Sequence, residues 1–265
     1  MNLRTFELPG ADGKLIRGDH AQGTGRQILF ITGFLSKRWG NKSKALAQWC
    51  AEQGWAFCCY DVRGFGDSEG TFTDYCLSDW IADARSVISM LTKSSHSTPP
   101  SPPRQDAAVP GLTIVGNSLG GWIAWLMAQE YDQVERLMLI APAFNMMGVR
   151  AKTITPERRH DWHSAGWMPW DDDPLHRAWP LSWKWVEESE TYWASSFDHV
   201  RRVKTVILHG TEDTVILPQG SREFVNLLQR HDRSYPVDLR LIPGDHRLSA
   251  PEHMETLRQL LLQPA

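Results

Sequence analysis

The sequence has no long apolar run and no excess of charge of one sign. None of its hydrophobic stretches approaches the about 20 residues that a membrane-spanning helix needs, so no membrane span is expected. Its 28 basic and 31 acidic residues are interspersed and leave a formal net charge of -3. This balance disfavours nucleic acid or an anionic membrane surface as the partner. The opening residues, 1–5, lack a signal-peptide core, and we expect a cytoplasmic protein.

Cysteine is scarce, and its positions have no metal-ligand spacing. The chain contains four cysteines, of which Cys58 and Cys59 are adjacent in a strand-like segment. Their side chains would point to opposite faces of a sheet, so buried, reduced thiols are expected, in keeping with a reducing cytosol. The acidic run Asp171–Asp173 could suggest a metal, but adjacent acids before a proline are more typical of a solvated turn. No metal site is predicted.

The chain does contain a repeated alternation of short apolar strands and amphipathic helices. Residues 4–9 and 15–19 flank an Asp-Gly turn and predict an opening hairpin. Further strands are expected at 27–32, 55–60, 112–115, 134–140, 203–208 and 237–242. Helices are expected at 44–53, 77–91, around 224–228, and from a capping-box pattern that begins at Ser249. This order predicts an α/β fold with a mostly parallel, doubly wound sheet of about eight strands. The prolines and serines of 94–111 predict an extended surface loop.

Polar loops follow five of the predicted strands. They contain, in chain order, Thr32, Asp61, Ser118, Asp213 and His246. Because the active site of a doubly wound sheet lies at the C-terminal ends of its strands, these loops are expected to meet at one edge.

Ser118 is the central residue of a G-x-S-x-G pattern at 116–120, directly after the apolar strand 112–115 and before a helical pattern. In this strand–turn–helix setting the pattern predicts a nucleophile elbow, a sharp turn that holds the serine in a strained conformation. The flanking glycines let neighbouring backbone approach the turn. The setting favours a nucleophile over the alternative of a plain tight turn.

A serine hydroxyl is a poor nucleophile until a histidine can accept its proton. Of the ten histidines, His246 follows the last predicted strand and is the preferred base. His209 lies at the end of the strand before it and is interpreted as a hydrogen-bonded core residue. His253 falls within the closing helix.

The histidine in turn needs a carboxylate that holds it in the correct tautomer. Asp213, three residues after Gly210, has the spacing that places a carboxylate at a strand exit facing the histidine loop. Glu212 and Asp245 are weaker candidates and are interpreted as solvated charges.

Two backbone N–H groups are expected to form an oxyanion hole. One belongs to Leu119, directly after the proposed nucleophile, and the other to Phe34, directly after Gly33. The glycine leaves room for the acyl oxygen beside the chain.

These residues together resemble an α/β-hydrolase over nearly the whole chain, because nucleophile, acid and base occur in that family's order. More closely, the chain is similar to the mitochondrial acyl-protein thioesterase and mycophenolic acid acyl-glucuronide esterase group of that family. The matching stretches are 33–36, 116–122, 208–210 and 245–247. The resemblance implies hydrolysis of S-acyl thioesters and acyl esters without a cofactor. The chain is expected to depart from that group in three respects: no transit peptide is expected before the core, 94–111 is extra, and 145–200 matches weakly.

Residues 144–200 interrupt the strand–helix rhythm after the sixth strand and predict a cap inserted into a core of 1–143 and 201–265. The segment holds seven of the thirteen tryptophans: Trp162, Trp167, Trp170, Trp179, Trp183, Trp185 and Trp193. Each could simply pack the core of the cap. Trp167 and Trp170 are also candidates to roof an apolar acyl pocket, because aromatic side chains supply large, rigid contact areas.

The sequence therefore predicts a serine-dependent acyl hydrolase that acts on a small-molecule or carrier-bound ester or thioester. One alternative is an acyltransferase or lactone-forming enzyme that releases the same acyl-enzyme to an alcohol, as in hydrolase-like proteins that unload polyketide synthases. A second alternative is a non-catalytic ligand receptor on a hydrolase fold. The sequence does not specify the acyl chain, the acceptor or the oligomeric state.

Overall fold

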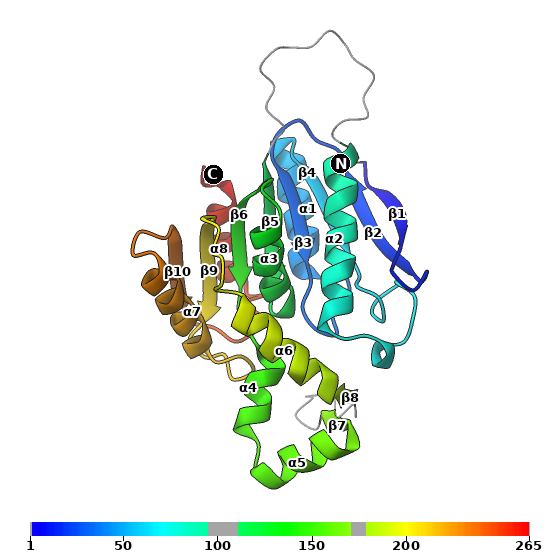
Figure 1. Ribbon diagram of the computed structural model, residues 1–265. Helices are drawn as coiled ribbons and strands as arrows, with labels where there is room; N and C mark the ends of the chain where they lie inside the picture. The colour runs from blue at the N-terminus through cyan, green and yellow to red at the C-terminus, as the bar shows by residue number, and fades with distance from the viewer. Residues whose placement is uncertain (1, 95–110, 171–178, 265) are drawn as a thin grey trace.

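The computed structural model of the protein describes residues 2–94, 111–170 and 179–264. An eight-stranded sheet crosses the molecule in the order β1-β2-β4-β3-β5-β6-β9-β10 (Figure 1). The pairing is antiparallel at one edge of the sheet. There β2 (Leu15–Ala21) lies between β1 (Arg4–Pro9) and β4 (Ala56–Tyr60) and runs antiparallel to both. The other strands run parallel to their neighbours: β3 (Gln27–Ile31), β5 (Leu112–Asn117), β6 (Val134–Ile140), β9 (Lys204–Gly210) and β10 (Val237–Ile242). The predicted mostly parallel sheet of eight strands is confirmed.

Helices cover both faces of this sheet and divide the core into two layers. On one face lie α1 (Asn41–Gln53) and α8 (Pro251–Leu262), and on the other lie α2 (Leu77–Ser94), α3 (Leu119–Glu130) and α7 (Pro218–His231). Cys58 packs in the second layer and its neighbour Cys59 in the first, as the alternation of side chains along a strand requires. All four cysteines are buried and unpaired.

Helix α2 shows how the apolar pattern produces its packing. Its apolar residues recur every three or four positions, so they form one stripe of the helix surface. The side chains of Trp80, Ile81, Ala84, Val87, Ile88 and Leu91 are all at most 1% exposed. Burying this stripe against the sheet is the main reason that the helix is stable there, because isolated helices are marginal in water.

The cap segment, residues 144–200, lies between β6 and β9 in the chain. It contains α4 (Met146–Thr153), α5 (Pro156–Ala165), the hairpin of β7 (Trp167–Trp170) and β8 (Trp179–Ser182), and α6 (Trp183–Ser195). Figure 1 shows these elements beyond the end of the sheet toward which β6 and β9 point. The cap segment is therefore next to the strand ends where the polar loops gather. Of the loop predicted at 94–111, residue 94 ends α2, and residues 95–110 fall outside the described residues.

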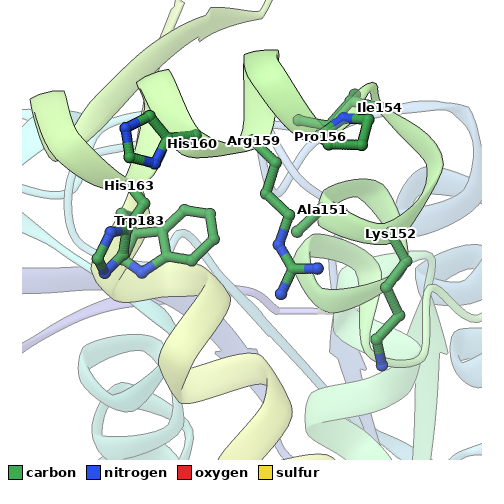
Figure 2. A pocket seen from close by; sticks show the side chains of 8 residues that line it. All are labelled: Ala151, Lys152, Ile154, Pro156, Arg159, His160, His163 and Trp183. Carbon is green, nitrogen blue, oxygen red and sulfur yellow. The ribbon is translucent and has the colours of Figure 1, made fainter.

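The cap segment also contains a cavity of about 490 Å³ between α4, α5 and α6. Figure 2 shows Arg159, His160 and His163 of α5 on its lining, with Trp183 of α6 beside His163. Its described lining combines basic, aromatic and aliphatic side chains and includes neither Ser118 nor His246. It is therefore separate from the candidate site that follows.

Two predicted helix starts are wrong. The helix expected from residue 44 begins at Asn41, as α1. Helix α8 begins at Pro251 with Ala250 as its N-cap, and no side chain caps it. Ser249 instead donates its hydroxyl to the carbonyl of Arg247, at 3.1 Å. Proline at the first helical position favours this start, because its ring already has a helical φ and its missing N–H would have no partner there.

Candidate active site

Ser118 sits on a sharp turn between β5 and α3 with φ 54° and ψ -120°. This conformation is rare for a residue with a side chain and stores about 1–3 kcal/mol of strain. The flanking glycines make room for it. A Cβ at Gly116 would lie 2.4 Å from the carbonyl oxygen of Gly120, and one at Gly120 would lie 2.3 Å from that of Ile31. The turn that holds Ser118 can therefore form only where these two positions carry no side chain.

The structure brings the three predicted polar side chains into one hydrogen-bonded chain. The Nε2 atom of His246 lies 3.1 Å from the Oγ atom of Ser118. The Nδ1 atom of the same ring lies 2.7 Å from Oδ2 of Asp213. Because an ionised carboxylate can only accept, we assign the proton to Nδ1, which leaves Nε2 free to accept from the serine hydroxyl. These residues come from the loops after β5, β9 and β10.

Asp213 is only 2% exposed and accepts hydrogen bonds on both carboxylate oxygens. Its Oδ1 accepts from the backbone N–H groups of Val215 and Ile216, at 2.9 and 2.8 Å. Burial by itself raises the pKa of Asp213, but hydrogen bonds from His209, His246 and the Ile216 N–H outweigh burial and hold this pKa well below its usual range. The carboxylate therefore stays ionised at neutral pH.

The weaker acid candidates have other surroundings. Glu212 is exposed. Asp245 is also exposed, and its Oδ1 accepts from the backbone N–H groups of Arg247 and Leu248, at 3.0 and 3.1 Å. Asp245 thus shapes the turn that carries His246.

His209 was expected to be a hydrogen-bonded core residue, and it is completely buried with partners on both ring nitrogens. What the sequence did not indicate is that one partner is Asp213, whose Oδ2 lies 3.0 Å from its Nε2 atom. The available signal was the spacing of four residues between His209 and Asp213 around a strand end.

The two predicted oxyanion residues flank the serine in space. Leu119 is the first residue of α3 and directly follows Ser118. A Cβ at Gly33 would lie 3.0 Å from the Cβ of Ser118, so the backbone just before Phe34 runs against the serine. The chain then turns, because the N–H of Ser36 donates to the carbonyl of Gly33 at 3.2 Å.

Arg38 anchors this loop and was not singled out from the sequence. Its backbone N–H and its guanidinium both bond Asp61, in the loop after β4. The guanidinium also bonds Asp19 and Asp67, each at 2.8 Å. Three carboxylates around one buried arginine therefore tie the Phe34 loop to the rest of the sheet edge.

The ring of Phe34 belongs to an aromatic cluster that extends into the cap segment. Its centroid lies 5.0 Å from that of Trp185 and 5.4 Å from that of Phe72. Both of these residues also line a cavity of about 240 Å³, together with Trp167. Trp167 is 56% exposed. Trp170 belongs to β7, but its side chain is not among those that the structure describes.

Two other tryptophans of the cap segment are buried. Trp162 and Trp185 are each 1% exposed, and the indole N–H of Trp162 donates to the carbonyl of Leu181 at 2.8 Å. For Trp162 the interpretation as cap core is confirmed. The ring of Trp185 instead packs against Phe34 and Trp80, outside the cap segment, with centroids 5.0 and 4.9 Å away. Trp162 and Trp185 are buried whereas Trp167 is largely exposed, so the tryptophans of this segment occupy different environments.

Two negative findings apply to the described ranges 2–94, 111–170 and 179–264. No helix there is both long enough and apolar enough to cross a bilayer. No group of three or more His, Cys, Asp or Glu side chains there has an arrangement that could hold a metal ion. Asp171–Asp173 lie outside these ranges.

Comparison with protein families matches most of the chain. The family model described as serine aminopeptidase, S33, matches residues 26–160, and the prolyl oligopeptidase family model matches residues 109–262. The first match covers the elbow and the Phe34 loop. The second covers the elbow and the loops of Asp213 and His246.

Individual relatives agree with these matches. The mitochondrial palmitoyl-protein thioesterase ABHD10 of Rattus norvegicus is 30% identical over 251 residues, which are 93% of this chain and 75% of the relative. The solved structure of mouse α/β hydrolase domain-containing protein 10 matches with a TM-score of 0.79 and 23% identity, over 97% of this chain and 96% of the other. The structure of Est1E from Butyrivibrio proteoclasticus with bound ferulic acid has a TM-score of 0.73 and 21% identity, over 97% and 96%. The chain therefore belongs to the α/β-hydrolase family, in the thioesterase-like group.

Proposed function

We propose that this protein is a serine-dependent acyl hydrolase that cleaves an ester or thioester through an acyl-enzyme on Ser118. The observation that carries the proposal is the unbroken hydrogen-bonded chain from Ser118 through His246 to Asp213, with links of 3.1 and 2.7 Å. Membership of the α/β-hydrolase family and similarity to a thioesterase support hydrolysis as the reaction class.

In the first half of the reaction, Oγ of Ser118 attacks the carbonyl carbon while its proton passes to Nε2 of His246. Asp213 stabilises the resulting imidazolium through Nδ1. The negative oxygen of the tetrahedral intermediate accepts from the backbone N–H groups of Leu119 and Phe34. When the intermediate collapses, the bond from carbon to the leaving oxygen or sulfur breaks, and the leaving group takes the proton from His246.

In the second half, water replaces the leaving group. His246 accepts a proton from the water as it attacks the acyl carbon, and the bond from carbon to Oγ of Ser118 breaks. The free acid leaves and the serine regains its proton.

The acyl group is proposed to be apolar and to contact Trp167. The cavity of about 240 Å³ that Trp167 lines with Phe72 and Trp185 does not include Ser118 or His246 in its described lining. Its link to the site is Phe34 of the proposed oxyanion hole, whose ring contacts both Phe72 and Trp185. This cavity is smaller than a drug-sized ligand site, which has a volume of about 300–1,000 Å³. Its aromatic side chains favour an apolar ligand. Trp170 remains a candidate from the sequence alone. Two relatives support this substrate class, since one is called a palmitoyl-protein thioesterase and another was solved with ferulic acid.

The proposal is tested by labelling and turnover on one set of variants. Wild type, Ser118→Ala and the matched control Ser89→Ala on α2 are treated with a fluorophosphonate probe, which reacts with activated serines. The same proteins are assayed on a panel of acyl thioesters, acyl glucuronides and lactones, with mass spectrometry of the products. We expect wild type and Ser89→Ala to label and turn over, and Ser118→Ala to lose about a thousandfold or more in turnover.

Three outcomes would contradict the proposal. Near-normal turnover by folded Ser118→Ala would remove the serine mechanism. A wild-type protein that neither labels nor turns over any substrate would instead indicate a ligand receptor. Ester or lactone products in place of the free acid would show that the acceptor is an alcohol and not water.

A further inference from the structure

His209 is a completely buried histidine at the end of β9 whose ring makes polar contacts on both sides. Its Nδ1 atom lies 2.8 Å from the hydroxyl oxygen of Ser221 on α7. Its Nε2 atom lies 3.0 Å from Oδ2 of Asp213 and 2.9 Å from the carbonyl oxygen of Ile216. A ring held at both nitrogens in this way has one orientation.

These partners also assign the position of the proton. The Ile216 carbonyl and the ionised Asp213 carboxylate can only accept, so Nε2 carries the hydrogen and donates to both. The hydroxyl of Ser221 can donate to the unprotonated Nδ1. The buried ring is then satisfied as a neutral imidazole, without a charge that burial would penalise.

Two histidines therefore donate to one carboxylate oxygen. Oδ2 of Asp213 receives the N–H of His246 at 2.7 Å and that of His209 at 3.0 Å, while Oδ1 receives two backbone N–H groups. The backbone contacts hold one end of the carboxylate, and His209 holds the other end in the direction of His246. Without His209, the only side chain that bonds Oδ2 among the described residues is the one that must move protons.

We propose that His209 is a positioning residue for the acyl-transfer reaction, an inference that rests on the proposed function. It has two effects on the reaction. It fixes Oδ2 of Asp213 toward His246, and it takes up part of the negative charge that would otherwise stabilise the His246 imidazolium. Ser221 contributes indirectly, because its hydroxyl holds His209 in the tautomer that donates to Asp213.

Other titratable groups adjoin this arrangement and must be the same in every variant. Lys42 of α1 donates to the carbonyl of Arg247, beside Asp245, and burial lowers the pKa of Lys42 to about 8. Glu212 and Asp245 are exposed. None of them is changed below, so differences between variants report on the imidazole–carboxylate group itself.

Two amide substitutions separate positioning from packing. His209→Gln places an amide nitrogen where Nε2 was, within reach of Asp213, and gives up the contact with Ser221. His209→Asn places its amide where Nδ1 was, within reach of Ser221, and leaves Oδ2 of Asp213 with His246 alone. Both variants bury one amide at the same site, so a merely structural role for His209 predicts similar effects from both.

The experiment compares wild type, His209→Gln and His209→Asn, with kcat normalised to the fraction of protein that the fluorophosphonate probe labels. Ser118→Ala is measured beside them per total protein, without this normalisation. We expect His209→Asn to lose about tenfold to a hundredfold in kcat, as for one hydrogen bond to a charged group. His209→Gln should stay within about threefold of wild type. In the pH profile of kcat/KM, the midpoint of the acid limb should move to higher pH in His209→Asn and stay in place in His209→Gln.

Equal losses in the Gln and Asn variants, or an unchanged acid limb in both, would overturn the inference. If His209→Asn does not fold, Ser221→Ala decides the question. We expect a lower kcat and an acid limb moved to higher pH, and no change in either measurement would overturn the inference. Failure of the proposed function appears separately, as turnover that survives in Ser118→Ala.

Discussion

Replacing Asp213 by asparagine tests the geometry of the site sharply, because all four hydrogen-bond partners of its carboxylate are donors. Two are the ring N–H groups of His209 and His246 on one oxygen, and two are backbone N–H groups on the other. An amide can accept on only one of its two polar atoms. In either orientation, the NH₂ group of asparagine therefore faces two donors.

The size of the effect follows from these two orientations. With NH₂ toward the backbone, two hydrogen bonds of about 1.5–3 kcal/mol each are lost, and the free energy of unfolding falls by about 3 kcal/mol or more. With NH₂ toward the histidines, His246 must carry its proton on Nε2 and can no longer accept from Ser118. Turnover then falls by about ten-thousandfold, the loss that the wrong tautomer causes in a serine protease.

The assay measures kcat/KM on one ester, together with urea unfolding of the same protein. Glu212→Gln is the matched control, since it makes the same chemical change one residue earlier, on an exposed side chain. It should be nearly silent in both measurements. Wild-type turnover by Asp213→Asn, or a large loss confined to Glu212→Gln, would refute the assignment of Asp213 as the acid.

Three further predictions concern the acyl contact, the elbow and pH. Trp167→Ala should reduce kcat/KM for a long-chain ester more than for the acetyl ester of the same leaving group, because the proposed acyl contact requires a chain long enough to reach the aromatic cavity. Equal losses on both esters, or no loss on either, would show that Trp167 does not contact the acyl chain. Gly120→Ala should lower the free energy of unfolding by about 1–3 kcal/mol or more, since its Cβ would lie 2.3 Å from a backbone oxygen. The control is Gly220→Ala on α7, whose Cβ would meet no atom within 4 Å. In urea unfolding this control should be neutral or stabilising. The pKa of Asp213 is lower in the folded than in the unfolded protein, so its contribution to stability is complete above about pH 3.9 and is lost as pH falls through the folded value. The difference in unfolding free energy between wild type and Asp213→Asn should therefore shrink below that pH, and a constant difference would contradict the lowered pKa.

Much of the fold is readable from neighbouring residues in the chain. The stripe of apolar residues on α2 and the stop of α1 at Gly54, which has a φ of 69°, are local features. So is the strained turn at Ser118, because a strand, two flanking glycines and a helix start all lie within a few residues of it. Local sequence missed the start of α8, where two start signals, at Ser249 and Pro251, compete two residues apart.

The candidate site depended on both levels. The order of the loops allowed Ser118, Asp213 and His246 to be chosen as partners, and the structure brings these side chains together although serine and histidine are 128 positions apart. Their catalytic roles, the cap as a substrate cover and a cytoplasmic location stay predictions.

What the sequence by itself determined is the set of local elements, the strained serine and the loops that meet at one sheet edge, because these follow from backbone preferences and from the rules of strand order. Only the tertiary structure decided which atoms share which hydrogen bonds. That Arg38 binds three carboxylates and that His209 shares an oxygen of Asp213 with His246 depends on side-chain directions set by packing between distant elements. A one-dimensional pattern contains residue types and spacings, but a hydrogen bond depends on distances and angles that exist only once the core has packed.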